Sequence, residues 1–264
     1  DDVVTVAFDA ASQSVTESAG SGSIAVSLSI TSTFDVTIPY TVSGTAAGSS
    51  VDHEFVDGSL TVLAGSTAGT ITASLNDDAL DEDDETVVVT MTTGSLVNAS
   101  AGGVTAHTLT VTDDDATPTV AFSAASQSVS ESVGSVSFSV ELSAVSGLDV
   151  TVPYTVGGTA TGGSVDHDLT ASSIAIAAGS ASGSGSFTVA ADTTAESDET
   201  VVLSLDVGSL VNAAEGAQSD HTVTITDDDT APVATAQSVT TPEETAAAVT
   251  LAGTDADDDS LTYT

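Results

Sequence analysis

The 264-residue sequence contains no lysine and no arginine, and its 39 acidic residues give a formal net charge of -39 at pH 7. Binding to nucleic acid or to an anionic membrane surface begins with basic side chains that neutralise phosphate. The absence of these side chains excludes both classes of partner. It also leaves the carboxylates without salt-bridge partners from Lys or Arg, so acids that gather in one place need protons or metal ions to offset their repulsion.

Cysteines and long apolar runs are missing as well. Without cysteine, no disulfide can stabilise the chain. No apolar run approaches the roughly 20 residues that span a bilayer, so we expect no direct membrane insertion, and no basic segment precedes an apolar core at the start of the chain. Because the sequence begins at Asp1 and stops at Thr264 within a strand-like pattern, we expect it to be a piece of a longer protein.

What the sequence does contain is an internal repeat. Charged residues make up 15% of the chain, below the usual value of about 25%, and Val, Thr, Ser, Ala and Gly dominate. Val6-Ala7-Phe8 returns as Val120-Ala121-Phe122, 114 residues later (6 to 120), and the same offset relates 39–42 to 153–156 and 113–115 to 227–229. The constant register predicts two copies of one domain, over 1–116 and 117–230, and a partial third β domain over 231–264.

Each copy has the pattern of an all-β sandwich. Short β-branched runs alternate with Ser, Gly and Asp clusters at about the 8–12-residue spacing expected of that fold. In 23–29 and 108–112, apolar residues alternate with Ser or Thr, which predicts one buried and one solvated face. We predict no helix and seven strands per copy, in the first copy near Val3–Phe8, Ser23–Ser29, Val36–Val42, Ser59–Leu63, Gly69–Leu75, Thr86–Thr92 and Val104–Thr112, with a core that includes Phe8, Phe34, Tyr40, Phe55, Leu75 and Val88.

The acidic residues are not scattered along the copy. Seven of the nine residues from Asp77 to Glu85 are acidic, and the other groups are Glu17, Asp52 and 113–115. If seven antiparallel strands follow a Greek-key order, all four groups fall on connections at one end of the sandwich. We therefore expect them to converge at one pole and to form an oxygen-rich site of the kind that Ca²⁺ selects. A solvated acidic rim that binds nothing is the alternative.

Several motifs in a fixed order resemble the Calx-beta domain, an immunoglobulin-like sandwich of sodium–calcium exchangers, integrin β4 and bacterial surface proteins. They are the Val-Thr-Glu-Ser turn at 15–18, the stretch 44–52, the acidic run 76–85 that leads into 86–89, and the closing segment 111–115. The resemblance implies Ca²⁺ as the cofactor. It implies that the ligands in the first copy are Glu17, Asp52, Asp77, Asp78, Glu82, Glu85, Asp113, Asp114 and Asp115, and in the second copy Glu131, Asp166, Asp192, Glu196, Glu199, Asp227, Asp228 and Asp229.

The two copies differ in their acidic loop. Ala191 stands where the first copy has Asp77, and neutral residues dilute the rest of the loop. Since calcium affinity follows the number of charged ligands, we predict that the second copy binds fewer ions or binds them more weakly. In the first copy, Asp81, Asp83 and Asp84 are expected to be solvated or to lie outside the inner ligand sphere.

The four histidines give no sign of a transition-metal site. His53 and His167 follow the aspartates where the family usually has an aromatic residue, and we interpret them as rings that fill the same pocket. A metal role would need further nitrogen or sulfur ligands nearby, and the sequence offers none. His107 and His221 also lack a partner motif.

The last segment resembles the opening of a bacterial cadherin-like repeat. In such repeats, acidic residues bind calcium at a domain junction, so the resemblance implies that Glu244, Asp255, Asp257 and Asp259 are ligands there. The competing interpretation is a flexible acidic linker.

The sequence contains no catalytic motif, neither a Gly-x-Ser-x-Gly elbow nor a P-loop, a zinc-protease helix or a dinucleotide fingerprint, so we expect that the protein is not an enzyme. We expect the two repeated domains to be calcium-binding spacer modules of a secreted bacterial surface adhesin or extracellular fibre. They would act outside the cell and be made rigid by Ca²⁺ at domain junctions. Their expected partners are neighbouring domains of the same chain. The alternatives are a filament subunit that assembles with copies of itself and a calcium-sensing regulatory domain.

Overall fold

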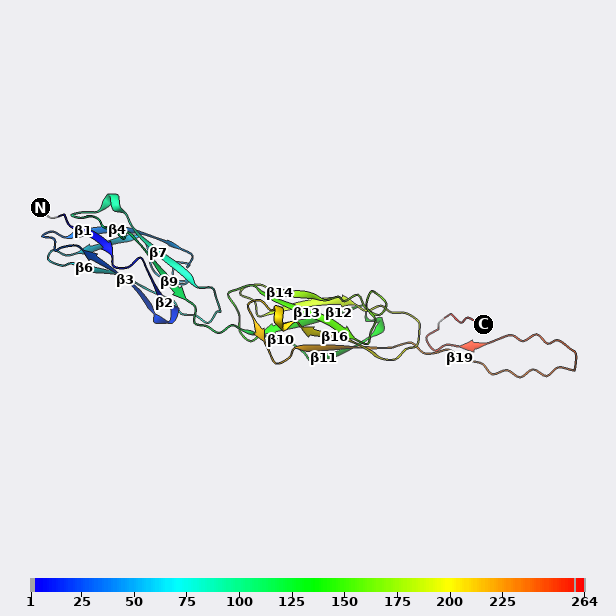
Figure 1. Cartoon of the computed structure of the whole chain (residues 1–264). Coiled ribbons are helices and arrows are strands. Elements are labelled where there is room, and N and C mark those ends of the chain that lie inside the picture. The colour runs from blue at the N-terminus through cyan, green and yellow to red at the C-terminus, as the bar shows by residue number, and fades with distance from the viewer. Residues whose placement is uncertain (1–2, 259, 264) are drawn as a thin grey trace. The chain divides into compact units, whose positions relative to one another are not determined.

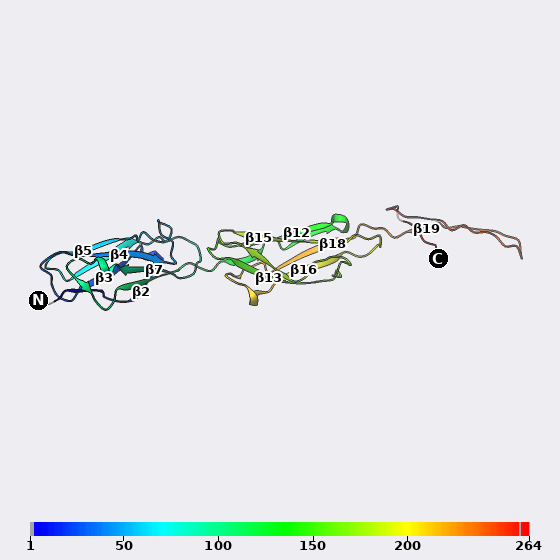
Figure 2. The same ribbon diagram turned by 90° about the horizontal axis from the view of Figure 1, so that it is seen from above.

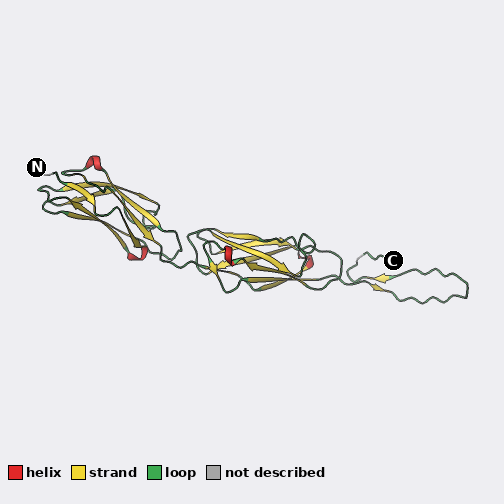
Figure 3. Cartoon of the chain, viewed as in Figure 1, coloured by secondary structure: helices red, strands yellow, loops and turns green. Residues whose placement is uncertain are grey.

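The computed structural model describes residues 3–258 and 260–263. The chain falls into two compact units, 1–117 with 146–148, and 118–145 with 149–264. Within the described ranges there is no α-helix, only four short 3₁₀ turns, drawn in red in Figure 3. No helix in those ranges is long and apolar enough to cross a membrane. The predicted all-β fold is confirmed.

The first domain is a sandwich of two sheets, which Figures 1 and 2 show from two sides. A four-stranded sheet has the order β6-β3-β1-β8, and a five-stranded sheet has the order β2-β9-β7-β4-β5. The strands are β1 (Thr5–Phe8), β2 (Ser12–Thr16), β3 (Ser21–Leu28), β4 (Val36–Gly44), β5 (Gly58–Val62), β6 (Ala68–Ser74), β7 (Glu85–Met91), β8 (Ser100–Ala101) and β9 (Ala106–Thr112), with 3₁₀ turns η1 (Glu17–Ala19) and η2 (Thr93–Ser95).

The second domain repeats this arrangement. Its sheets have the orders β15-β12-β10-β17 and β11-β18-β16-β13-β14. The strands are β10 (Thr119–Phe122), β11 (Ser126–Ser130), β12 (Ser135–Leu142), β13 (Val150–Gly158), β14 (Ser172–Ile176), β15 (Ser182–Thr188), β16 (Glu199–Leu205), β17 (Ala214–Glu215) and β18 (Asp220–Thr226), with 3₁₀ turns η3 (Glu131–Val133) and η4 (Val207–Ser209).

The core of each domain lies between its two sheets. In β3, exposed and buried residues alternate, and Ile24 and Val26 are fully buried, as the period of a strand requires. Phe8, Phe55 and Leu75 are buried as predicted, Tyr40 is half-buried, and Val88 lies half-buried on the outer side of β7. The predictions for Phe34 and Val88 were wrong. Phe34 follows β3 in a connection and is 67% exposed, and Val88 lies outside the core, which its neighbours Val87 and Val89 enter instead.

The first strand differs from the prediction. The chain leaves the four-stranded sheet after Phe8 and joins the five-stranded sheet as β2, which pairs in parallel with β9. The crossing is held by the main chain and by a histidine, since Thr108 N donates to Ala11 O (2.9 Å) and His107 Nδ1 lies 2.7 Å from Ala10 O. Neither β2 nor the two-residue β8 was predicted from the sequence. His107 therefore has a structural role.

The final segment contains two short paired strands, β19 (Val233–Ala234) and β20 (Gly253–Thr254). Most of its described residues are exposed. Thr230 N donates to Asp257 Oδ2 (2.7 Å), and Asp257 N donates to Asp255 Oδ1 (3.0 Å). Asp259, one of the predicted junction ligands, lies outside the described residues. The resemblance to a cadherin-like repeat stays a prediction.

Candidate metal centre

Strand register brings the acidic groups of the first domain together. β2 runs parallel to β9 with Thr16 beside Thr112, so the next residues, Glu17 and Asp113, leave the sheet side by side. Glu85 opens β7 opposite Val111, close to the same end of β9. A bridge between His53 and Leu75 brings the loop that carries Asp52 to the start of the acidic run. The four groups therefore converge at one pole, as the topology predicted.

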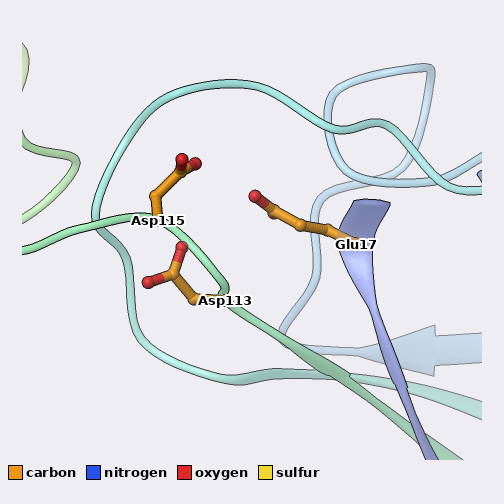
Figure 4. A group of neighbouring side chains, drawn as sticks. All are labelled: Glu17, Asp113 and Asp115. Carbon is orange, nitrogen blue, oxygen red and sulfur yellow. The ribbon is translucent and has the colours of Figure 1, made fainter. Parts of the chain in front are cut away.

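The first cluster at this pole consists of Glu17, Asp113 and Asp115. One carboxylate oxygen from each lies within 4.8 Å of the others, and Figure 4 shows Glu17 pointing toward the two aspartates. Glu17 Oε1, Asp113 Oδ1 and Asp115 Oδ2 are buried without a hydrogen-bond partner. Glu17, Asp77 and Asp114 also bring oxygens within this distance.

Electrostatics in the first cluster favour bound protons or a cation. Burial, and then the charges of Asp113, Asp78, Asp115 and Asp114, raise the pKa of Glu17 to about 7. Burial also raises the pKa of Asp113, although backbone hydrogen bonds oppose this. Buried acceptors that lack donors are costly unless something positive approaches them. The cluster therefore has the donor set and the electrostatic need for a hard cation.

Asp52, Glu82 and Glu85 form a second acidic group at this pole, in which Asp52 hydrogen-bonds to Glu85 and the charge of Glu82 interacts with both. Burial raises the pKa of Glu85 to about 7, and a side-chain hydrogen bond with Asp52 adds to the shift. The pKa of Glu82 is raised by burial and then by the charges of Asp78 and Asp52. Glu85 thus holds its proton more tightly than an isolated glutamate when no cation is present.

The second domain has two separate clusters, and Asp192, the counterpart of Asp78, takes part in the first of them. One brings together oxygens of Glu131, Asp192 and Asp229, and the other those of Asp166, Glu196 and Glu199. Burial raises the pKa values of Glu131 and Glu199, and Asp166 hydrogen-bonds to Glu199.

The first cluster of the second domain is better satisfied by protein groups than its counterpart. Glu131 Oε1 accepts a hydrogen bond from Asp192 N (2.7 Å), whereas Glu17 Oε1 has no partner. Among the described residues, every buried carboxylate oxygen that lacks a partner belongs to the first domain.

Two of the predicted ligands are turned toward hydroxyl groups. Asp114 Oδ2 accepts from Ser18 Oγ (2.6 Å), and Asp228 Oδ2 accepts from Ser130 Oγ (2.8 Å) and Ser132 Oγ (2.7 Å). The hydroxyls of Ser132 and Ser130 lower the pKa of Asp228. Hydroxyl neighbours of this kind were missed in the sequence because Ser and Thr are abundant everywhere in the chain.

Within the acidic run, Asp81 is not solvated, but it belongs to none of the close carboxylate groups among the described residues. Asp81 is buried, and its Oδ1 accepts a hydrogen bond from Thr117 Oγ1 (3.1 Å). Asp83 and Asp84 are exposed as expected, and Asp84 Oδ1 accepts from Asp113 N (3.2 Å). Asp78 is exposed and caps its own turn by accepting from Leu80 N (2.8 Å).

The histidines near the pole are structural. His53 is 4% exposed, accepts a hydrogen bond from Phe55 N at Nδ1 (3.0 Å) and lies against the Phe55 ring. His167 accepts from Leu169 N in the same way (3.1 Å). Each cluster contains only carboxylate oxygens, which suits calcium rather than a metal that prefers nitrogen or sulfur.

Fold and site together define a tandem of immunoglobulin-like β-sandwiches with an acidic pole on each. The family model of the Calx-beta domain matches residues 1–115 and 113–229. The chain belongs to the Calx-beta domain family. No curated protein matches the chain.

Several solved structures are similar to the chain. CBD12 from CALX1.2 is 17% identical, with a TM-score of 0.40, and the match covers 84% of this chain and 99% of that one. The calcium binding domain CBD12 of CALX1.1 is 18% identical, with a TM-score of 0.40 and coverage of 83% and 98%. The apo form of the Calx CBD1 domain is 17% identical, with a TM-score of 0.39 and coverage of 43% and 100%.

Proposed function

We propose that each acidic pole binds calcium ions, and that the two domains serve as calcium-stabilised spacers in an extracellular surface protein. The observation that carries the proposal is the set of buried carboxylate oxygens without hydrogen-bond partners on Glu17, Asp113 and Asp115, in a chain without Lys or Arg. Membership of the Calx-beta family supports the same ion.

Two groups of residues would hold the ions at each pole. In the first domain one group is Glu17, Asp113 and Asp115, joined by Asp77 and Asp114, and the other is Asp52, Glu82 and Glu85. The bound cation supplies the positive charge that the sequence lacks. The protein groups orient the carboxylates, and Ser18 and Ser132 hold the outer aspartates by hydroxyl hydrogen bonds.

Stabilisation by calcium follows from linkage. An ion that binds only the folded state adds a free energy of RT ln(1 + [L]/Kd), so millimolar extracellular calcium supports even sites with a Kd of about 10⁻⁴–10⁻³ M. The spacer role and the location outside the cell extend this mechanism. Asp113–Asp115 lie only three residues before Pro118 in the sequence, so ions bound there would order the segment that joins the domains.

Isothermal titration calorimetry of the full chain with CaCl₂, and then with MgCl₂, tests the proposal. We expect saturable calcium binding with more than one ion per chain, and weaker magnesium binding because Mg²⁺ demands a tighter octahedral shell. Small-angle scattering of the same samples tests the spacer role, for which calcium should give a longer and stiffer particle. A flat calcium titration would refute the proposal.

A further inference from the structure

The side chain of Asn76 makes contacts in the first domain that no side chain makes at the corresponding place in the second. It lies between β6 and the acidic run. Its side-chain Nδ2 donates to the carbonyl oxygens of Ser50 and Val51, the latter at 2.9 Å. Its backbone N donates to Asp52 O (2.9 Å). This neutral residue therefore holds the loop before Asp52 at three successive carbonyl groups.

The turn that Asn76 holds is strained. Ser49 and Ser50 have φ values of 65° and 64°, in the left-handed region that residues with a Cβ atom disfavour. The turn positions Asp52, whose Oδ2 accepts from Ala47 N and whose N donates to Ala47 O (2.9 Å). Strained backbone persists where surrounding contacts fix it, and the Asn76 amide supplies such contacts.

In the second domain, the position that corresponds to Ser49 is not strained, and no side-chain amide corresponds to that of Asn76. Its loop has the same backbone frame, since Asp166 N donates to Thr161 O (3.0 Å) and Ala190 N donates to Asp166 O (2.9 Å). Gly163, which tolerates its φ of 78°, stands in place of Ser49, and Ala190 stands in place of Asn76. At this first position, the unfavourable backbone occurs in the domain that has the amide, whereas Ser164, the counterpart of Ser50, keeps its φ of 68° without one.

We infer that Asn76 is a positioning residue, which fixes the Asp52 loop so that the Asp52 carboxylate stays beside Glu85, where a cation can bind both. The inference rests on the proposed calcium binding and adds a residue that is not itself a ligand. Groups that orient metal ligands typically change metal affinity by about 10–100-fold when they are removed. Asn76 is also a second difference between the two domains, besides the replacement of Asp77 by Ala191 in the second domain.

Calorimetric titration of the full chain with CaCl₂ tests this inference. Asn76→Ala should weaken binding at the first domain about tenfold, and Ser49→Gly in the same chain should restore part of the loss by relieving the turn. Asn98→Ala is the matched control, because Asn98 Nδ2 donates to Asp35 O (2.8 Å) in a connection away from the acidic pole, and its calcium affinity should equal that of the wild type.

A double-mutant cycle distinguishes positioning from general destabilisation. The effect of Asn76→Ala should vanish in an Asp52→Asn background, whose centre is already impaired, and should persist in a Glu17→Gln background. If Asn76→Ala binds like the wild type, or if its effect adds fully to that of Asp52→Asn, the inference is overturned while calcium binding stands. A wild-type chain that binds no calcium would overturn both.

Discussion

At the residue scale, the central feature is a set of acids that must be either protonated or metal-bound. Glu17 and Glu85 have pKa values of about 7, because burial and neighbouring carboxylates disfavour their charged forms. In the chain without ions, both groups therefore titrate near neutral pH. This coupling makes proton binding and calcium binding competitive at the same oxygens.

Substitution of Glu17 separates the effect of charge repulsion on stability from the effect of calcium binding. Glu17→Gln removes a repelling charge, so in chelator we expect the free energy of unfolding at pH 8 to rise by about 1–2 kcal/mol. In calcium the same variant should lose part of the stabilisation by the ion. Urea denaturation in both buffers measures the two changes. Glu131→Gln is the matched variant of the second domain, and its gain in chelator should be smaller, because Glu131 already accepts a hydrogen bond from Asp192 N.

Stability should depend on pH in opposite ways with and without calcium. The folded chain without ions binds protons at Glu17 and Glu85 more tightly than the unfolded chain, whose carboxyls keep a pKa near 4.5. This tighter proton binding stabilises the folded chain below about pH 4.5, and the stabilisation is lost as the pH rises through about 7. In chelator the melting temperature should therefore fall between pH 5 and pH 8. In calcium it should rise over the same range, since ions require the deprotonated acids. Parallel curves in the two buffers would contradict the account.

At the element scale, the sequence predicted the strands that carry the core and missed those that do not. Runs such as 36–42 and 86–92 are rich in β-branched residues and were placed correctly. β2 was missed because Ser12–Thr16 has a single apolar residue, Val15, and its pairing with the distant β9 decides its conformation. No local pattern reveals a two-residue strand such as β8.

The site was predictable only to the level of the pole. Strand order alone brought the four acidic groups to one end, and the structure shows the register that does so. The division into two clusters depends on neighbours such as Thr16 beside Thr112, which sequence patterns do not specify. Asn76 escaped notice because a single amide beside many carboxylates carries no motif. The assignment of individual ligands stays a prediction.

Gly44 provides a test of the strand that frames the pole. It ends β4 opposite Val87 with φ 139°, and a Cβ atom there would lie 1.9 Å from Thr86 O. Gly44→Ala should therefore destabilise the first domain by more than about 1 kcal/mol. Gly94→Ala, where a Cβ atom meets nothing within 4 Å, should have little effect. Urea denaturation compares the two variants. Equal midpoints would show that the backbones of β4 and β7 shift to make room for the added Cβ atom.

At the scale of the whole molecule, the two copies share a fold but differ in how protein groups satisfy their acidic poles. In the first domain Glu17 Oε1 is buried without a partner, whereas its counterpart in the second domain, Glu131 Oε1, accepts a hydrogen bond from Asp192 N. We therefore expect calcium to raise the melting temperature of the first domain more than that of the second. Calorimetric scans of the full chain, with Glu17→Gln and Glu131→Gln to assign the transitions, measure the difference, and equal shifts would contradict it.

The most direct test of the account is a crystal structure of the full chain grown with Tb³⁺ in place of calcium, with anomalous scattering used to locate the ions. Our account predicts anomalous peaks between Glu17, Asp113 and Asp115 and between Asp52, Glu82 and Glu85, with weaker or fewer peaks at the second pole. Carboxylates that point apart into solvent, with no peak at either pole, would contradict it.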